Sequence, residues 1–246
     1  MKFKLILVSG LFISACSDAN SIDKLSKELE LECKVAGVGS KQCEILQLEN
    51  YTVAEKEGTM GFLYLFGYKN IEPDYDKAFY WLNKSAKSNN PEALNALGIM
   101  YFAGIGRPKD YHQAEKYYLL ANKYGEKNEA KVNLAELYRG SPEFGIPLNF
   151  EKSKEWYLLA VSENPSRAYE GLSKLYLTQN NYKEVYNYAL KAANLGNQEA
   201  QYNLGVLYEK GIYVKEDKKQ AERWYTQAAA QGHANAINNL KVLKKE

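Results

Sequence analysis

The sequence predicts an all-α protein, a solenoid of stacked helix pairs that begins with an N-terminal helical cap. The alanines of a recurring motif lie 32 to 38 residues apart. At this period each unit is one supersecondary element that must stack on its neighbours to bury a core. The motif is an alanine, a leucine four residues later and a tyrosine four further on, at Ala93/Leu97/Tyr101, Ala130/Leu134/Tyr138, Ala168/Leu172/Tyr176 and Ala200/Leu204/Tyr208, with Ala236/Leu240 as a truncated last copy.

The first fifteen residues have the pattern of a secretory signal peptide. Lys2 and Lys4 precede an apolar run from 5 to 13, and small residues follow it before Cys16. The ending Ile13-Ser14-Ala15-Cys16 resembles a bacterial lipobox, which implies that Cys16 becomes the lipidated first residue of the mature chain. Ordinary signal cleavage and a short membrane anchor are the alternatives, although the run is shorter than the roughly 20 residues of a spanning helix.

The residue after the cysteine, Ser17, favours the outer membrane over retention in the inner membrane. We therefore expect a lipid-anchored protein of the bacterial cell envelope, on the periplasmic face of the outer membrane, with residues 16–21 as a polar tether. Loss of residues 1–15 would leave 30 basic and 30 acidic side chains. Because polyanion binding generally needs a basic stripe, the neutral balance argues against nucleic acid as a partner.

Residues 22–55 are predicted to form the cap, a pair of helical segments joined near a glycine-containing turn. Cys33 and Cys43 flank this turn. In an oxidising compartment the two thiols are well placed for a disulfide, which would contribute on the order of 2–3 kcal/mol. Free thiols or metal ligands are the alternatives, but only His112 and His233 could help to ligate a metal, and neither is near in sequence.

The repeat array is predicted to cover residues 56–246, and each unit follows one plan. A helix carries the alanine, leucine and tyrosine, a glycine-containing loop follows, an aspartate such as Asp110 starts a second helix, and a glycine such as Gly125 ends it. The units depart from this plan at loops and ends. The third has a longer loop from 140 to 149, and the loop of the fourth shrinks to residues 178–181.

From Ala200 to His233 the chain reads A-x-x-x-L-G-x-x-Y-x-x-G, a short loop, then D-x-x-x-A-x-x-W-Y-x-x-A-A-x-x-G-H. This pattern resembles the Sel-1-like repeat, a relative of the tetratricopeptide repeat. The resemblance implies a right-handed superhelix whose members are mostly adaptors and scaffolds that bind other proteins in a groove.

In tetratricopeptide relatives the first helix of each pair contacts the ligand, on the side away from its packing stripe. For any one of the matching positions, packing between repeats is the alternative to ligand contact, and for the polar ones a solvated face is. The matching positions are Phe62, Leu65, Phe66, Asn95, Ile99, Phe102, Val132, Glu136, Arg139, Lys174, Leu177, Tyr202, Val206 and Glu209.

No catalytic constellation is evident, and we expect no enzyme activity, cofactor, metal or small-molecule substrate. Gly104, Gly106 and Arg107 lack the strand and the glycine spacing of a phosphate-binding loop, so they are interpreted as a structural turn. Some disulfide-rich proteins that resemble this family are associated with β-lactam binding or hydrolysis. They carry a cysteine pair in each repeat, and this chain does not.

Two binding roles remain. The first is a periplasmic, lipid-anchored scaffold or adaptor that holds a partner protein in its concave groove. The second is an immunity protein that neutralises a secreted toxin acting in the periplasm, since small lipoproteins of this repeat class sometimes have that role. The identity of the partner separates them.

Overall fold

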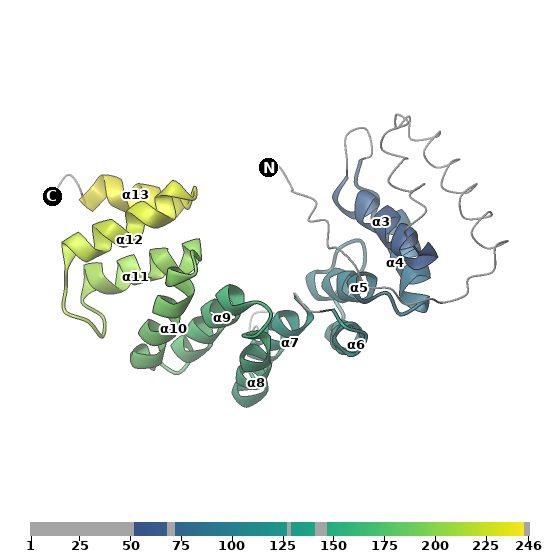
Figure 1. The fold of residues 1–246 in the computed structure, drawn as a ribbon, viewed down its shortest axis with the longest axis horizontal. Helices are drawn as coiled ribbons and strands as arrows, with labels where there is room; N and C mark the ends of the chain where they lie inside the picture. The colour runs from purple at the N-terminus through teal and green to yellow at the C-terminus, as the bar shows by residue number, and fades with distance from the viewer. Residues whose placement is uncertain (1–51, 68–71, 127–128, 141–146, 244–246) are drawn as a thin grey trace.

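The computed structural model describes residues 52–67, 72–126, 129–140 and 147–243. Eleven helices fall within these ranges, and Figure 1 shows them as a curved array of consecutive elements. They are α3 (Val53–Phe66), α4 (Tyr75–Lys87), α5 (Pro91–Ala103), α6 (Tyr111–Lys123), α7 (Ala130–Arg139), α8 (Phe150–Ala160), α9 (Pro165–Leu177), α10 (Tyr182–Asn194), α11 (Gln198–Lys210), α12 (Lys218–Ala230) and α13 (Ala234–Leu243).

Consecutive helices pack as pairs, and each pair packs on the next. The pairs are α3 with α4, α5 with α6, α7 with α8, α9 with α10 and α11 with α12, and the second helix of each pair also contacts the first helix of the following one. The remaining helix, α13, packs on α12 and corresponds to the truncated copy that begins near Ala236. The predicted all-α array of stacked helix pairs is thereby confirmed.

Small residues let the paired helices approach closely. The five motif alanines, from Ala93 to Ala236, are at most 1% exposed. A Cβ atom added to Gly98 would lie 2.5 Å from the Tyr118 ring, and one added to Gly205 would lie 2.5 Å from the Tyr225 ring. Tyrosine rings of the second helices therefore pack directly on the backbone of the first helices, which explains the alternation of small and large residues in each unit.

Side-chain caps begin the second helices where the sequence indicates. The carboxylates of Asp74, Asp110 and Asp217 each accept a hydrogen bond from the backbone N–H three residues later. Asn149 and Asn181 have the same role in the third and fourth units. A cap of this kind contributes about 1 kcal/mol, so each second helix starts at a fixed residue.

A backbone hydrogen bond closes every unit in the same way, whatever the length of its loop. The N–H of the cap residue donates to the carbonyl oxygen of the tyrosine near the end of the first helix. The five bonds are Asp74 to Tyr64 at 2.8 Å, Asp110 to Tyr101 at 3.0 Å, Asn149 to Tyr138 at 2.7 Å, Asn181 to Tyr176 at 3.2 Å and Asp217 to Tyr208 at 2.9 Å. Loop length can therefore vary between units while the crossing of the paired helices is preserved.

Four of the five turns that follow the second helices contain a left-handed residue, and the turn after α8 does not. Gly125, Gly196 and Gly232 follow the second helices with φ of 97°, 85° and 90°, and Asn89 takes the same place after α4 with φ of 60°. Glycine and asparagine adopt this conformation more readily than other residues. The prediction that Gly125 ends its helix is confirmed.

The first described helix crosses the predicted boundary between the cap and the array. Thr52 is the N-cap of α3, and its hydroxyl and the Glu55 carboxylate bond to each other's backbone N–H groups. The boundary placed after residue 55 therefore falls inside the first helix of the array. Most of the predicted cap, together with Cys16, Cys33, Cys43 and residues 16–21, lies outside the described residues.

Candidate partner-binding surface

The first helices of the units form the inner side of the curved array. Helix α3 contacts α5, α5 contacts α7, and α7 contacts α9, although each of these pairs is separated by a second helix in the chain. Among the described residues, no second helix approaches the second helix of the next unit as closely. Figure 1 agrees for the middle of the array, with α5 and α7 toward the opening of the arc and α6 and α8 away from it. We call the exposed side of the first helices the inner face.

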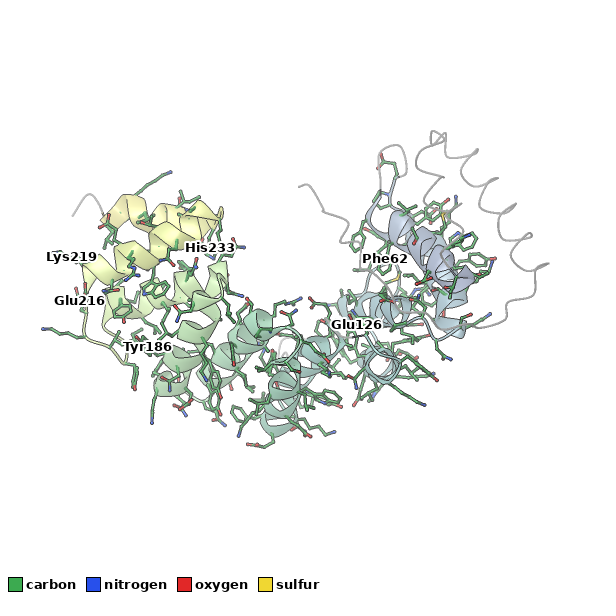
Figure 2. All side chains as sticks on the ribbon, viewed as in Figure 1. Phe62, Glu126, Tyr186, Glu216, Lys219 and His233 are labelled. Atoms are coloured by element: carbon green, nitrogen blue, oxygen red, sulfur yellow. The ribbon has the colours of Figure 1, made fainter. Side chains whose placement is uncertain are left out.

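On α3, two of the three predicted groove residues pack within the protein. Leu65 is buried in the first hydrophobic cluster, and Phe62 packs partly against it. The Phe66 ring is 65% exposed and stacks parallel to Phe62 with their centroids 6.3 Å apart. Figure 2 shows Phe62 near one end of the curved array and His233 near the other.

On α5, only Ile99 of the predicted residues is well exposed, at 37%. Asn95 is buried, and its side-chain oxygen accepts a 2.9 Å hydrogen bond from the Asn133 amide of α7. Phe102 is partly buried and meets the Tyr111 ring edge-on. The helix therefore presents one apolar side chain on the inner face, beside an amide pair that joins two units.

On α7, the predicted residues are committed to contacts inside the protein. Val132 is buried in the cluster that joins α7, α8 and α9. Glu136 accepts hydrogen bonds from Arg139 at 2.6 Å and from the Tyr157 hydroxyl at 2.5 Å. The charges of Glu136 and Arg139 therefore neutralise each other, and Glu136 also binds α8 through Tyr157.

On α9, Lys174 pairs with Glu170 at 2.5 Å, and Leu177 is 49% exposed at the helix end.

On α11, Tyr202 and Val206 pack partly against the last core cluster, and Glu209 accepts a 2.5 Å hydrogen bond from the Tyr225 hydroxyl. This repeats the bond between Tyr157 and Glu136 two units earlier. Glu136 and Glu209, which the resemblance placed in the groove, therefore accept hydrogen bonds from buried tyrosines of their own units.

A series of polar contacts between units runs along the inner face, and the sequence pattern did not reveal it. Glu129 pairs with Arg167 of the next unit, Glu170 accepts from Asn197, and Glu199 lies 3.1 Å from His233. Burial raises the Glu129 pKa, and Arg167 opposes that shift. The sequence does contain one signal for this series: Glu129 and Arg167 occupy equivalent positions in adjacent units, each directly before the motif alanine.

The glycine-containing loop of the second unit is a structural turn. Arg107 lies over the Phe79 ring, 3.2 Å from its centroid, and lies 3.8 Å from the Asp76 carboxylate. Gly106 lies against Tyr75, so a Cβ atom there would approach the Tyr75 Cβ to 2.4 Å.

Over the described ranges, no cluster of three or more histidine, cysteine, aspartate or glutamate side chains could hold a metal ion. None of the helices in those ranges is both long and apolar enough to span a bilayer.

Tyrosines with raised pKa values limit the stability of the folded protein at alkaline pH. Burial raises the pKa of Tyr118, burial and the Glu209 carboxylate raise that of Tyr225, and the hydrogen bond with Tyr186 together with burial raises the pKa of Tyr208 to about 12. In the unfolded chain these phenols ionise near pH 10. Because the folded state holds the protons more tightly, stability is fully present below about pH 10 and falls as the pH rises through the raised pKa values.

We expect phenolate absorbance to rise in two steps in an alkaline titration, and the second step to coincide with loss of helical circular dichroism. The same titration in concentrated urea, where all 21 tyrosines are exposed, should show one step near pH 10. A single step near pH 10 with the helices intact would contradict the prediction.

This geometry defines an all-α array of helix-pair repeats whose first helices form its inner face. The Sel1 repeat matches residues 60–90, 91–123, 128–165, 166–197 and 198–233, and the chain belongs to this family. It is 30% identical over 207 residues to chitin synthase regulatory factor 3 of Schizosaccharomyces pombe, covering 77% of this chain and 21% of that protein. The chain spans 31% to 35% of the length of three other curated relatives that it matches.

Solved structures share the fold. A Sel1 repeat protein from Oxalobacter formigenes superposes with a TM-score of 0.66 at 24% identity, over 88% of this chain and 86% of that one. The immunity protein Pa5087 from Pseudomonas aeruginosa gives a TM-score of 0.53 at 18% identity, over 85% of this chain and 81% of that one. At these identities the likeness concerns the fold alone.

Proposed function

We propose that this Sel1 repeat protein is a scaffold that binds a partner protein on its inner face, and that binding rather than catalysis is its role. The observation that supports this is the presence of apolar side chains, Ile99 and Leu177, that remain 37% and 49% exposed on first helices. On the first helices α7 and α9 the charges are paired within the protein, as in Glu136 with Arg139 and Glu170 with Lys174. A surface of exposed apolar groups between satisfied polar ones suits a protein partner.

Substitution of the exposed inner-face residues tests the proposal. Ile99→Glu and Leu177→Glu should each weaken binding by at least about tenfold, because each places a charge in an apolar contact. Neither side chain is buried, so the melting temperature should change little. The partner is first captured by cross-linking in intact cells, and its affinity is then measured with the purified variants.

The second helices supply matched controls. Leu119 on α6 and Leu158 on α8 are 41% and 47% exposed. Leu119→Glu and Leu158→Glu should therefore leave the affinity unchanged. Equal losses from the α5 and α6 substitutions would contradict binding on the inner face.

The resemblance of residues 13–16 to a lipobox supports a lipid anchor at Cys16 in the cell envelope. We expect Cys16→Ser to move the protein from the membrane fraction to the soluble fraction, since acyl chains contribute about 0.8 kcal/mol of membrane affinity per buried methylene. Cys33→Ser is the control and should stay with the membrane. If Cys16→Ser also stayed, an uncleaved N-terminal anchor would explain the attachment better.

An immunity role remains an alternative that the identity of the captured partner decides. A secreted toxin that loses activity when the protein binds would favour it, and an envelope protein that keeps its activity would favour the scaffold. β-Lactam hydrolysis stays a remote alternative because the repeats lack the paired cysteines on which that comparison depends.

A further inference from the structure

The turn into the last helix is held by a histidine that makes three contacts. The Nδ1 atom of His233 lies 3.2 Å from the backbone N of Ala236, and its Nε2 atom lies 3.1 Å from a Glu199 carboxylate oxygen. The ring also stacks on Tyr202, with centroids 4.5 Å apart and an interplanar angle of 20°. Figure 2 shows His233 where α12 turns into α13.

These contacts assign the proton of the neutral ring. Ala236 supplies an N–H, so Nδ1 must accept, and the ring proton therefore sits on Nε2 and points to Glu199. In this form His233 is the N-cap of α13. It satisfies an amide that would otherwise lack a partner at the start of the helix.

Asparagine has this role at the equivalent turns of other units. The side-chain oxygens of Asn90, Asn164 and Asn197 accept from the backbone N–H three residues later, at the starts of α5, α9 and α11. An amide oxygen keeps its lone pairs throughout the physiological pH range, whereas imidazole gains a proton there. The cap of α13 is therefore sensitive to pH in a way that these three caps are not.

We propose that His233 is a pH-sensitive cap that loosens α13 on acidification. A second ring proton would sit on Nδ1 and face the Ala236 N–H, so two donors would oppose each other. The positive ring would also lie at the positive end of the helix dipole. Glu199 and the Tyr202 ring both attract the charged imidazole. The His233 ring therefore keeps its contacts with α11 while the first turn of α13 is released.

The neighbouring groups favour this division. The titratable groups in contact with the ring, Glu199 and Tyr202, both belong to α11. From α12, Tyr225 packs against Tyr202, and its hydroxyl donates to Glu209 of α11. Protonation therefore strengthens the attachment of the ring to α11 and weakens only its bond to α13.

Loosening α13 would uncover the end of the core. Ala236 is buried against α12 residues that include Tyr225 and Ala228, and the Asn239 amide donates to the Tyr225 hydroxyl at 3.0 Å. Acidification would thus expose apolar surface at the C-terminal end of the array without opening the units before it, since each unit contacts only its neighbours.

Hydrogen exchange of the full chain tests the proposal. After correction for intrinsic rates, protection of the Ala236 amide should fall roughly five- to tenfold between about pH 8 and pH 5, the effect expected for loss of one cap. His233→Asn restores the cap used at Asn197 and should make protection independent of pH over this range. Constant protection in the wild type, or the same fall in His233→Asn, would overturn the proposal.

A second variant tests the part assigned to Glu199. Glu199→Gln keeps a hydrogen-bond acceptor but removes the charge that attracts the protonated ring. The midpoint of the loss of protection should therefore move to lower pH. A midpoint that does not move would overturn the inference that this carboxylate holds the charged ring.

Discussion

Tyr157→Ala should destabilise the protein by about 3–5 kcal/mol, the range for loss of a large buried aromatic side chain. Tyr157 is fully buried in the cluster that joins α7, α8 and α9, so it belongs to two units at once. Its ring lies against the backbone of Gly171, where an added Cβ would come within 2.1 Å of it. The hydroxyl also donates to Glu136.

Because the stability of an array depends on its interfaces between neighbours, loss at this position should also weaken the coupling between its two halves. We expect the wild type to unfold in urea in a single transition and Tyr157→Ala to unfold in two. Tyr157→Phe keeps the ring and loses only the hydroxyl bond, so it should remain a single transition destabilised by about 1–2 kcal/mol. If Tyr157→Ala unfolded in a single transition near the wild-type midpoint, this residue would not couple the halves.

The architecture was predictable because the residues that define it act locally. Aspartates such as Asp110 can cap a helix in isolation, and glycines such as Gly125 can end one. Short stretches of sequence therefore determine where the helices of each unit begin and end. The recurrence of the same signals then fixed the stacking. The spacing of Thr52 and Glu55 continues the helical pattern of the residues before them, so the predicted boundary was drawn after residue 55, although the two residues form a capping box at the start of α3.

The candidate site was less predictable because it depends on geometry between units. The resemblance to tetratricopeptide repeats placed Ile99, Val132 and Glu136 on one type of surface, yet Ile99 is exposed, Val132 is buried and Glu136 bonds to Tyr157. Which outcome holds depends on the side chains that neighbouring helices bring to each position. Val132 packs with residues of α8 and α9, and the hydroxyl that binds Glu136 comes from Tyr157 of α8. The local sequence around each position contains no information about these partners.

The polar side chains illustrate the same limit. A glutamate on the exposed side of a helix predicts a solvated or ligand-binding group when its own helix is considered alone. Glu209 instead accepts from the hydroxyl of Tyr225, which is fully buried. Charge reversal at Glu209 would therefore disturb the fold as well as any partner contact, and for this reason the binding test uses Ile99 and Leu177.

Gly205→Ala should destabilise the protein by about 2 kcal/mol, although alanine is the better helix former by about 1 kcal/mol. The new Cβ would lie 2.5 Å from two carbon atoms of the Tyr225 ring. That ring packs against Tyr202, and its hydroxyl contacts Glu209 and Asn239, so it cannot swing aside. Overpacking of this kind costs 1–3 kcal/mol or more, and here it outweighs the gain in helix propensity.

The sign of the effect should reverse when the ring is absent. In a Tyr225→Ala background the added methyl group has room, so Gly205→Ala should stabilise that variant by up to about 1 kcal/mol. The fourth unit already has such a pair, with Ser173 in place of the glycine and Ala189 in place of the tyrosine. Urea unfolding of the four proteins gives the coupling energy, and Gly205→Ala effects of equal sign in both backgrounds would show that the ring contact does not determine the need for glycine.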